Sequence, residues 1–140
     1  MKKLFTNEIK VLADKEMVRQ LLLDANYLMR WNPTIGQVEG ISDNKFVLYR
    51  NQMAVNQQEV ISIHQETNKI IYQSDGKNFS YTLVFRIESD ESQMVRVSED
   101  FFVIEVIKIL PLSLLKPVIQ RAFNKNLLGF KNLAEQVTKM

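Results

Sequence analysis

Polar side chains interrupt two stretches of the sequence in which apolar residues alternate with a period of two. Along 53–63 the odd positions are apolar except for Gln57 and Glu59, and along 95–103 they are apolar except for Glu99. Such alternation predicts strands with one buried face, so these three side chains should point toward the core. Burying a polar group costs free energy unless it is paired. We therefore expect the three residues in a polar cluster on a concave apolar face.

Two further polar residues and several aromatic ones belong to the same predicted faces. Tyr81 and Phe85 lie on the apolar face of the predicted strand 79–88, and Asn126 points into the apolar arc of the predicted C-terminal helix. The predicted ligand-binding residues share these inward positions: Trp31, Gln57, Glu59, Tyr81, Phe85, Glu99, Phe123, Asn126 and Phe130.

These residues allow three interpretations, which the sequence leaves open. In the first, a few polar groups orient a ligand in an apolar pocket, and the aromatic rings serve as core, cavity wall or both. In the second, two buried carboxylates raise one pKa toward neutrality for acid–base chemistry, while Tyr81 steadies an enolate. In the third, Glu59 or Glu99 bonds Asn126 in an internal network without a ligand. We assign no catalytic residue.

The composition excludes several kinds of chemistry. The chain contains no cysteine, which rules out disulfides, thiolate zinc sites and a cysteine nucleophile. Its single histidine, His64, falls on the polar face of a predicted strand, which disfavours a Ser–His–Asp triad. Gly36 and Gly40 are too sparse for a phosphate loop. No Asp, Glu and His cluster has metal-ligand spacing, so we expect neither a metal nor a cofactor.

The elements that must position these residues follow from periodicity and from turn residues. A first strand over 5–11 is followed by a short helix capped by Asp14 and a second short helix capped by Asp24 and ended by Pro33. Six strands with tight turns then predict an antiparallel meander over 35–41, 45–50, 53–66, 69–74, 79–88 and 93–106.

The last segment has the period of a helix. Apolar residues between 119 and 137 fall in one arc, with Pro117 in the first turn of the predicted helix. Asn126 points into this arc and Leu128 points out of it. A helix of this length with a broad apolar stripe needs a large apolar partner, which the sheet supplies.

This order of elements, the Trp31-Asn32-Pro33 segment after the helix pair and the closing segment 126–135 together resemble a known superfamily. It is the START-related, birch-pollen-allergen-like superfamily, also called SRPBCC or polyketide cyclase/dehydrase-like. The resemblance covers essentially the whole chain. It implies an α+β helix-grip fold, with a curved seven-stranded antiparallel sheet wrapped around the long helix. In relatives, the cavity between them holds lipids, sterols, polyketides or other apolar molecules.

Size and composition agree with one globular domain over 1–140. Of the 140 residues, 46% are hydrophobic and 24% are charged, which suffices for a core without disulfides. The first ten residues lack the apolar run of a signal peptide, and charges and prolines interrupt the most apolar stretch, 103–119. We therefore expect a cytoplasmic protein.

Positive charge gathers toward the C-terminal end. Residues 108–140 carry a net charge of +5, whereas 1–107 carry −3. The apolar run 109–115 between Lys108 and Lys116 is either a buried connection or a gate, 108–117, that docks on an anionic membrane or admits an anionic amphiphile. We expect no nucleic-acid partner, because aromatic residues do not interleave with the basic ones. The oligomeric state is left open.

The sequence therefore favours binding, transport or sequestration of a small hydrophobic or amphipathic ligand, lipid-like or polyketide-like, in an internal cavity. The alternatives are an enzyme of the polyketide cyclase or dehydratase type and a protein-interaction module with a closed core. In the last case, the outer sheet face or Leu128 would meet the partner.

Overall fold

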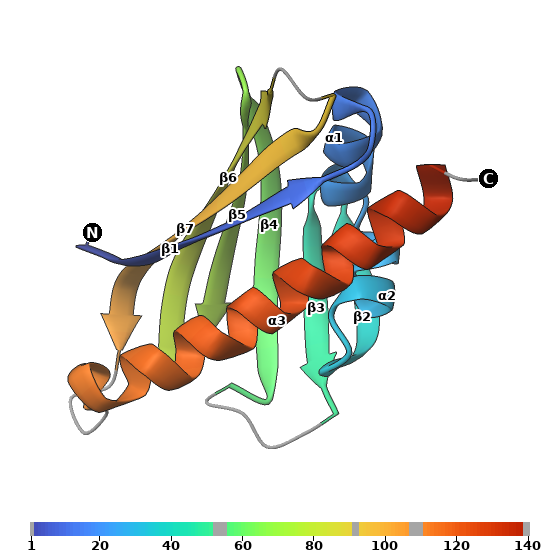
Figure 1. The fold of residues 1–140 in the computed structure, drawn as a ribbon. Helices are drawn as coiled ribbons and strands as arrows, with labels where there is room; N and C mark the ends of the chain where they lie inside the picture. The colour runs from blue at the N-terminus through green and yellow to red at the C-terminus, as the bar shows by residue number, and fades with distance from the viewer. Residues whose placement is uncertain (1, 52–55, 91–92, 107–110, 139–140) are drawn as a thin grey trace.

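The computed structural model describes residues 2–51, 56–90, 93–106 and 111–138. Within these residues, seven antiparallel strands form one curved sheet that wraps around a long C-terminal helix (Figure 1). Short helices follow the first strand, so the predicted α+β helix-grip arrangement is confirmed.

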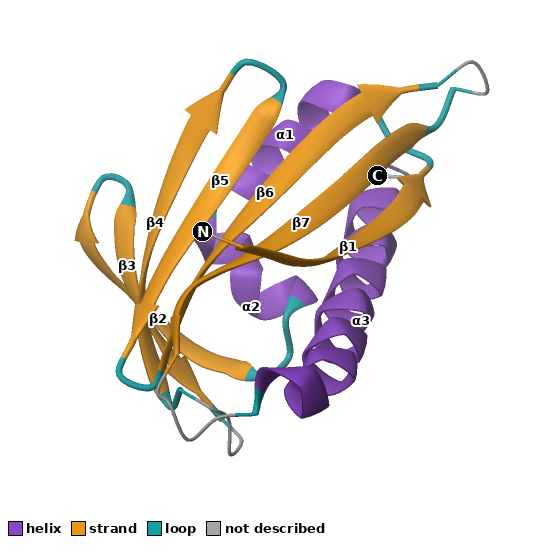
Figure 2. Cartoon of the chain, turned by 90° about the vertical axis from the view of Figure 1, so that its left-hand side faces the viewer, coloured by secondary structure: helices purple, strands orange, loops and turns teal. Residues whose placement is uncertain are grey.

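The strands are β1 (Lys2–Val11), β2 (Ile35–Ser42), β3 (Lys45–Arg50), β4 (Gln58–Glu66), β5 (Lys69–Gly76), β6 (Phe79–Ser89) and β7 (Val95–Val106). The helices are α1 (Lys15–Leu23), the 3-10 helix η1 (Ala25–Tyr27), α2 (Leu28–Trp31) and α3 (Leu112–Thr138). The strand order is β1-β7-β6-β5-β4-β3-β2. Because α1, η1 and α2 carry the chain across the concave side, β1 and β2 lie at opposite edges of the sheet (Figure 2).

Both predicted helix caps are present. A carboxylate oxygen of Asp14 accepts the N–H of Glu16 at 3.2 Å, and one of Asp24 accepts the N–H of Asn26 at 2.9 Å. These bonds satisfy backbone donors that the first turn of a helix leaves without partners. The second short helix is divided into η1 and the single turn of α2, which ends just before Pro33.

The predicted start of the long helix is wrong. The helix begins at Leu112, and Pro117 lies inside it rather than in its first turn. The N–H groups of Leu114 and Leu115 both donate to the carbonyl of Pro111 at 3.0 Å, which starts the helix earlier. Half-buried Leu112 packs against the core, so tertiary contact outweighs the hydrogen bond that Pro117 cannot donate.

Two predicted strands begin too early. Residues 53–55 of the predicted strand 53–66 lie outside the described residues, residues 56 and 57 are not in a strand, and β4 starts at Gln58. Gln57 precedes this strand and is exposed, so its predicted place on the concave face is wrong. β7 starts at Val95 because the backbone φ of Gln93 is 65°, which no β-strand residue adopts.

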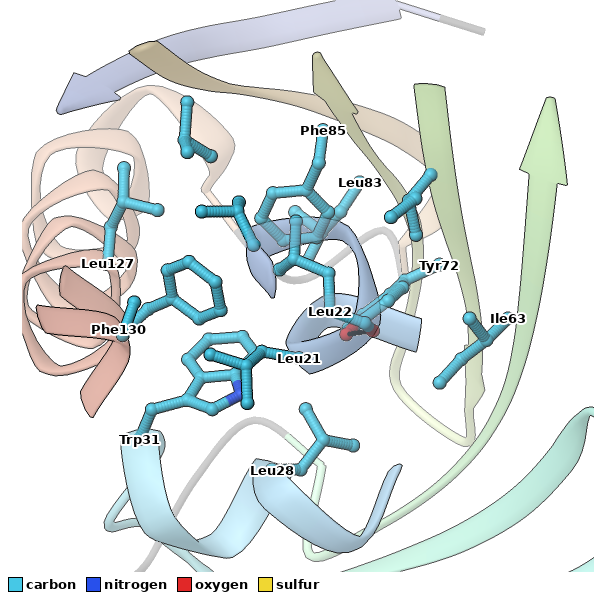
Figure 3. Packing of buried hydrophobic residues seen from close by; sticks show 14 of the residues in the cluster. Leu21, Leu22, Leu28, Trp31, Ile63, Tyr72, Leu83, Phe85, Leu127 and Phe130 are labelled. Carbon is cyan, nitrogen blue, oxygen red and sulfur yellow. Dashed lines mark hydrogen bonds between the residues drawn. The ribbon is translucent and has the colours of Figure 1, made fainter. Parts of the chain in front are cut away.

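The core fills the space between the concave face of the sheet and the three α-helices. Figure 3 shows Trp31 of α2 against Phe130 of α3, whose ring centroids are 5.4 Å apart with an interplanar angle of 83°. Gly129 makes this approach feasible. A Cβ atom at position 129 would lie 2.6 Å from the carbonyl oxygen of Trp31.

Replacing Gly129 with alanine should therefore destabilise the protein, although alanine is normally the better helix former by about 1 kcal/mol. We expect a net loss of about 1–3 kcal/mol in the free energy of unfolding, because α2 and α3 must separate. Chemical denaturation measures it. In the control Gly40→Ala the new Cβ meets Phe46 at 4.0 Å, an ordinary contact, and stability should change by less than about 0.5 kcal/mol. Equal effects of both substitutions would contradict the close-approach explanation.

Candidate functional site

A small cavity lies between α2, α3 and the concave face of the sheet. Its volume is about 20 Å³, room for about one water molecule. The apolar wall includes Leu28, Ile35, Leu48, Ile61 and Leu83. The aromatic residues at the wall are Trp31, Tyr72 and Phe123. The polar side chains that reach it are Asn32, Arg50, Ser74, Tyr81, Glu99 and Asn126.

A buried ion pair organises one side of this cavity. Glu59 is 3% exposed, and its Oε2 lies 2.8 Å from Nε and 2.7 Å from Nη2 of Arg50. Its other oxygen, Oε1, accepts hydrogen bonds from Ser74 Oγ at 2.7 Å and from Tyr81 Oη at 2.6 Å. Both carboxylate oxygens are therefore engaged, and the buried charge has the partner that burial demands.

Arg50 carries this network toward α2. Its Nη1 donates to Thr34 Oγ1 at 2.8 Å, and the Thr34 hydroxyl donates to Asn32 Oδ1 at 2.9 Å. Hydrogen bonds thus connect the end of α2 with β3, β4, β5 and β6.

Arg50 and Ser74 were missed by the sequence analysis, although a signal was present. Arg50 follows Phe46 and Leu48 on one face of its strand, and Ser74 follows Ile70 and Tyr72. Each is thus a polar residue at the end of an apolar alternation, the same signal that identified Glu59.

The Tyr81 hydroxyl donates a hydrogen bond to Glu59, and the Tyr81 ring packs among aromatic rings. Its ring lies 4.8 Å from that of Phe101 in a stacked arrangement, and Phe123 meets it edge-on at 5.7 Å. Burial, followed by the neighbouring charge of Glu59, raises the pKa of the Tyr81 hydroxyl. Tyr81 therefore stays protonated and serves to hold the carboxylate.

Glu99 faces the cavity from β7 in a different environment. It is 1% exposed, and its Oε1 accepts one hydrogen bond from Asn7 Nδ2 at 3.3 Å. Burial raises the pKa of Glu99 to about 8, against the hydrogen bond from Asn7, which lowers it, and with a smaller rise from Asp100. Near neutral pH the carboxyl group is therefore mostly protonated and uncharged, and it can both donate and accept a hydrogen bond.

Asn126 brings a polar side chain to the cavity wall. It lies on α3, is 7% exposed and lines the cavity. Among the described residues, no hydrogen-bond partner of its side-chain amide is found, so the predicted bond to Glu59 or Glu99 is absent. The indole N–H of Trp31 is likewise buried without a partner in the described part of the chain.

The other predicted residues divide between cavity wall, core and surface. Phe123 lines the cavity, as do Trp31, Tyr81, Glu99 and Asn126. Phe85 and Phe130 are fully buried in the core behind the wall, where Phe85 packs on Tyr72 and Phe130 on Trp31. Gln57 and His64 are exposed and lie apart from the cavity. Within the residues that the structure describes, no group of three or more acidic and histidine side chains could hold a metal ion.

Comparison with known proteins shows the fold. No protein-family model and no curated protein matches the sequence. A START superfamily protein from Mycobacterium smegmatis superposes with a TM-score of 0.81 at 18% identity, over 96% of this chain and 98% of that one. A conserved protein from Geobacillus kaustophilus superposes with a TM-score of 0.74 at 12% identity, over 94% of each chain. The Aha1 dimer from Colwellia psychrerythraea gives 0.70 at 14% identity, over 96% of this chain and 97% of that one. The protein thus has the START-related helix-grip fold.

Replacing Glu99 with glutamine should remove a pH dependence of stability. From its ordinary value of 4.5 the pKa rises to about 8 in the folded protein. Between these pH values only the unfolded chain releases the proton, so wild-type stability falls as the pH rises. Across this pH interval the free energy of unfolding of the wild type should therefore fall by a few kcal/mol relative to that of Glu99→Gln, at about 1.4 kcal/mol per pKa unit.

Urea denaturation at several pH values across this interval measures the effect. Glu66→Gln is the matched control, since Glu66 is exposed on β4 and its replacement should leave the pH profile unchanged. Parallel stability curves for wild type and Glu99→Gln would show that Glu99 is not held protonated by burial.

Proposed function

We propose that the protein binds a small hydrophobic or amphipathic ligand in the cavity between α3 and the sheet. The observation that carries this proposal is the buried indole N–H of Trp31, a residue that lines the cavity and whose N–H has no hydrogen-bond partner in the described part of the chain. Asn126 lines the same, largely apolar wall, and no hydrogen bond of its side chain to another described residue is found. Leaving such a group unpaired costs free energy, which a ligand oxygen would recover. Apolar walls with a few polar groups are typical of small-molecule sites. The START-related fold supports the same function.

Ligand binding requires the cavity to expand, since it now has a volume of about 20 Å³. One part of the wall is suited to move, since Phe123 of α3 is only half-buried. We infer that the ligand displaces Phe123 and takes the place of the side-chain contacts that close the unliganded cavity.

The two alternatives find less support. In acid–base catalysis, the Tyr81 hydroxyl would have to donate a hydrogen bond to an enolate, but it already donates to Glu59. Glu99 would then be the acid or base. An interaction module with a closed core agrees with the small cavity volume, with exposed Leu128 and with the dimeric state of the Aha1 neighbour. Such a module, however, gives no role to the unpaired indole N–H of Trp31.

Fluorescence of Trp31 tests the binding proposal directly, because it is the single tryptophan of the chain and lines the cavity. We expect a saturable change on titration with at least one of two amphiphiles, decanol and decanoate. Replacing Ile61, which lines the cavity, with phenylalanine should abolish the response by filling the space. Ile63→Phe, on the same face of β4 but away from the cavity, should keep it.

Native mass spectra of the purified protein provide a second readout, since a bound cellular ligand adds mass that is lost on denaturation. Silence toward both amphiphiles together with a clean unliganded mass would contradict the proposal. Circular dichroism establishes that each variant is folded.

A second candidate function is contact with an anionic membrane at the start of α3. Leu114, inside the predicted gate 108–117, and Val118, one turn further along α3, are 72% and 61% exposed, whereas Leu112 packs against the core. A fully buried connection is therefore wrong at Leu114. Residues 108–110 of the predicted gate lie outside the described residues. Along 112–125 the helix carries Lys116, Arg121 and Lys125 and no acidic residue. Exposed apolar side chains flanked by cations favour an anionic bilayer surface. No helix in the described ranges is long and apolar enough to cross a membrane, and a cytoplasmic location stays a prediction.

Vesicle co-sedimentation tests this contact. We expect more protein on vesicles of phosphatidylcholine with phosphatidylserine than on phosphatidylcholine alone, and a loss of that excess when Leu114 and Val118 are both replaced by serine. Leu128→Ser is the control, because Leu128 is exposed elsewhere on α3. Equal recovery on both vesicles, or none on either, would exclude the contact.

A further inference from the structure

We propose that the cavity selects an uncharged, oxygen-bearing apolar molecule, such as a long-chain alcohol or ketone, and rejects the carboxylate of the same chain length. This inference rests on the proposed function and names the ligand class of that same cavity. It follows from how the charges and the unpaired polar groups of the wall are distributed.

An anionic ligand would need a cation in the cavity wall. Arg50 is the only Lys or Arg among the described residues that line the cavity, and a carboxylate ligand would have to pair with it. Its guanidinium already lies within 2.8 Å of Glu59 through two nitrogen atoms. Its Nη1 donates to Thr34. The charge that would attract an anion is therefore neutralised from within the protein.

An anionic ligand would have to compete with Glu59 for Arg50. Glu59 is held by Ser74 and Tyr81 as well as by Arg50, and its side chain is 4% exposed. A ligand carboxylate that took Arg50 would leave Glu59 buried beside a second negative charge. A ligand carboxylate that did not take Arg50 would be buried without a cation. Either arrangement leaves a buried charge without a compensating partner, which is strongly unfavourable.

A neutral ligand would meet two polar side chains of the cavity wall, one on α3 and one on β7. Asn126 of α3 offers an amide donor and acceptor with no partner among the described residues, and Glu99 of β7 also lines the cavity. Burial keeps the Glu99 carboxyl group mostly protonated at neutral pH because its pKa is raised to about 8. A hydroxyl or carbonyl oxygen can form a hydrogen bond with either group, whereas an added anion would raise the pKa of Glu99 further. The wall formed by α3 and β7 is therefore suited to a neutral oxygen.

The wild-type protein provides the first test, with Trp31 fluorescence followed during titration with decanol and with sodium decanoate at neutral pH. We expect decanol to bind at least about tenfold more tightly, since tenfold corresponds to about 1.4 kcal/mol. Decanoate binding as tightly as decanol, or more tightly, would overturn the inference while leaving the proposed function intact. Failure of both to bind would overturn the inference, and together with a clean unliganded native mass it would overturn the proposed function as well.

Glu59→Gln provides the second test, because it frees Arg50 at nearly constant side-chain volume. We expect decanoate affinity to rise at least about tenfold, with decanol affinity changed much less. In the double variant Arg50→Gln/Glu59→Gln, which has no free cation, decanoate should gain nothing. A folded Glu59→Gln protein that still rejects decanoate would overturn the assignment of selectivity to the ion pair. Should either variant fail to fold, the wild-type comparison decides.

Asn126→Leu tests the wall formed by α3 and β7. The substitution removes the unpaired amide at similar volume, so it should weaken decanol binding several-fold while the protein keeps or gains stability. Unchanged decanol affinity would show that Asn126 does not bind the ligand oxygen.

Discussion

The ion pair between Arg50 and Glu59 is the interaction on which the polar side of the cavity depends. Both side chains are at least nine-tenths buried, so the loss of either partner would leave a charge in apolar surroundings, at a far greater cost than the pair itself contributes. Arg50 ends β3 and Glu59 lies near the start of β4. The pair can form only if these strands keep their register, and Ser74 and Tyr81 then share one acceptor oxygen. A buried ion pair of this kind contributes more to specifying one arrangement than to stability.

The two sides of the cavity differ in how far their polar groups are satisfied. Around Glu59, donors and acceptors are matched within the protein. At the opposite side, Glu99 has one hydrogen bond, from Asn7, and Asn126 has none among the described residues. An amphipathic molecule in this space would gain hydrogen bonds only at the second side. In the proposed complex, the ligand oxygen would therefore lie toward α3 and β7.

The long helix connects the cavity with the surface. Gly129 holds the second half of α3 close to the backbone of α2, which fixes one end of the cavity. The first half carries Phe123 on its inner side and exposed Leu114 and Val118 on its outer side. A displacement of this half would move the wall and the exposed apolar surface together.

The sequence by itself determined the order of the elements and the inward positions of Glu59, Tyr81, Glu99 and Asn126, because periodicity and caps are local properties of the chain. The helix-grip arrangement of these elements was implied by the resemblance to START-related proteins. The sequence did not determine which polar groups pair. Arg50 meets Glu59 only because β3 and β4 are neighbours in register, and Asn126 stays unpaired only because of where α3 crosses the sheet. The early start of α3 and the exposure of Gln57 were also decided by tertiary structure. Hydrogen bonds and ion pairs act over a few ångströms, so they depend on distances between segments that are far apart in the sequence and meet only in the folded protein.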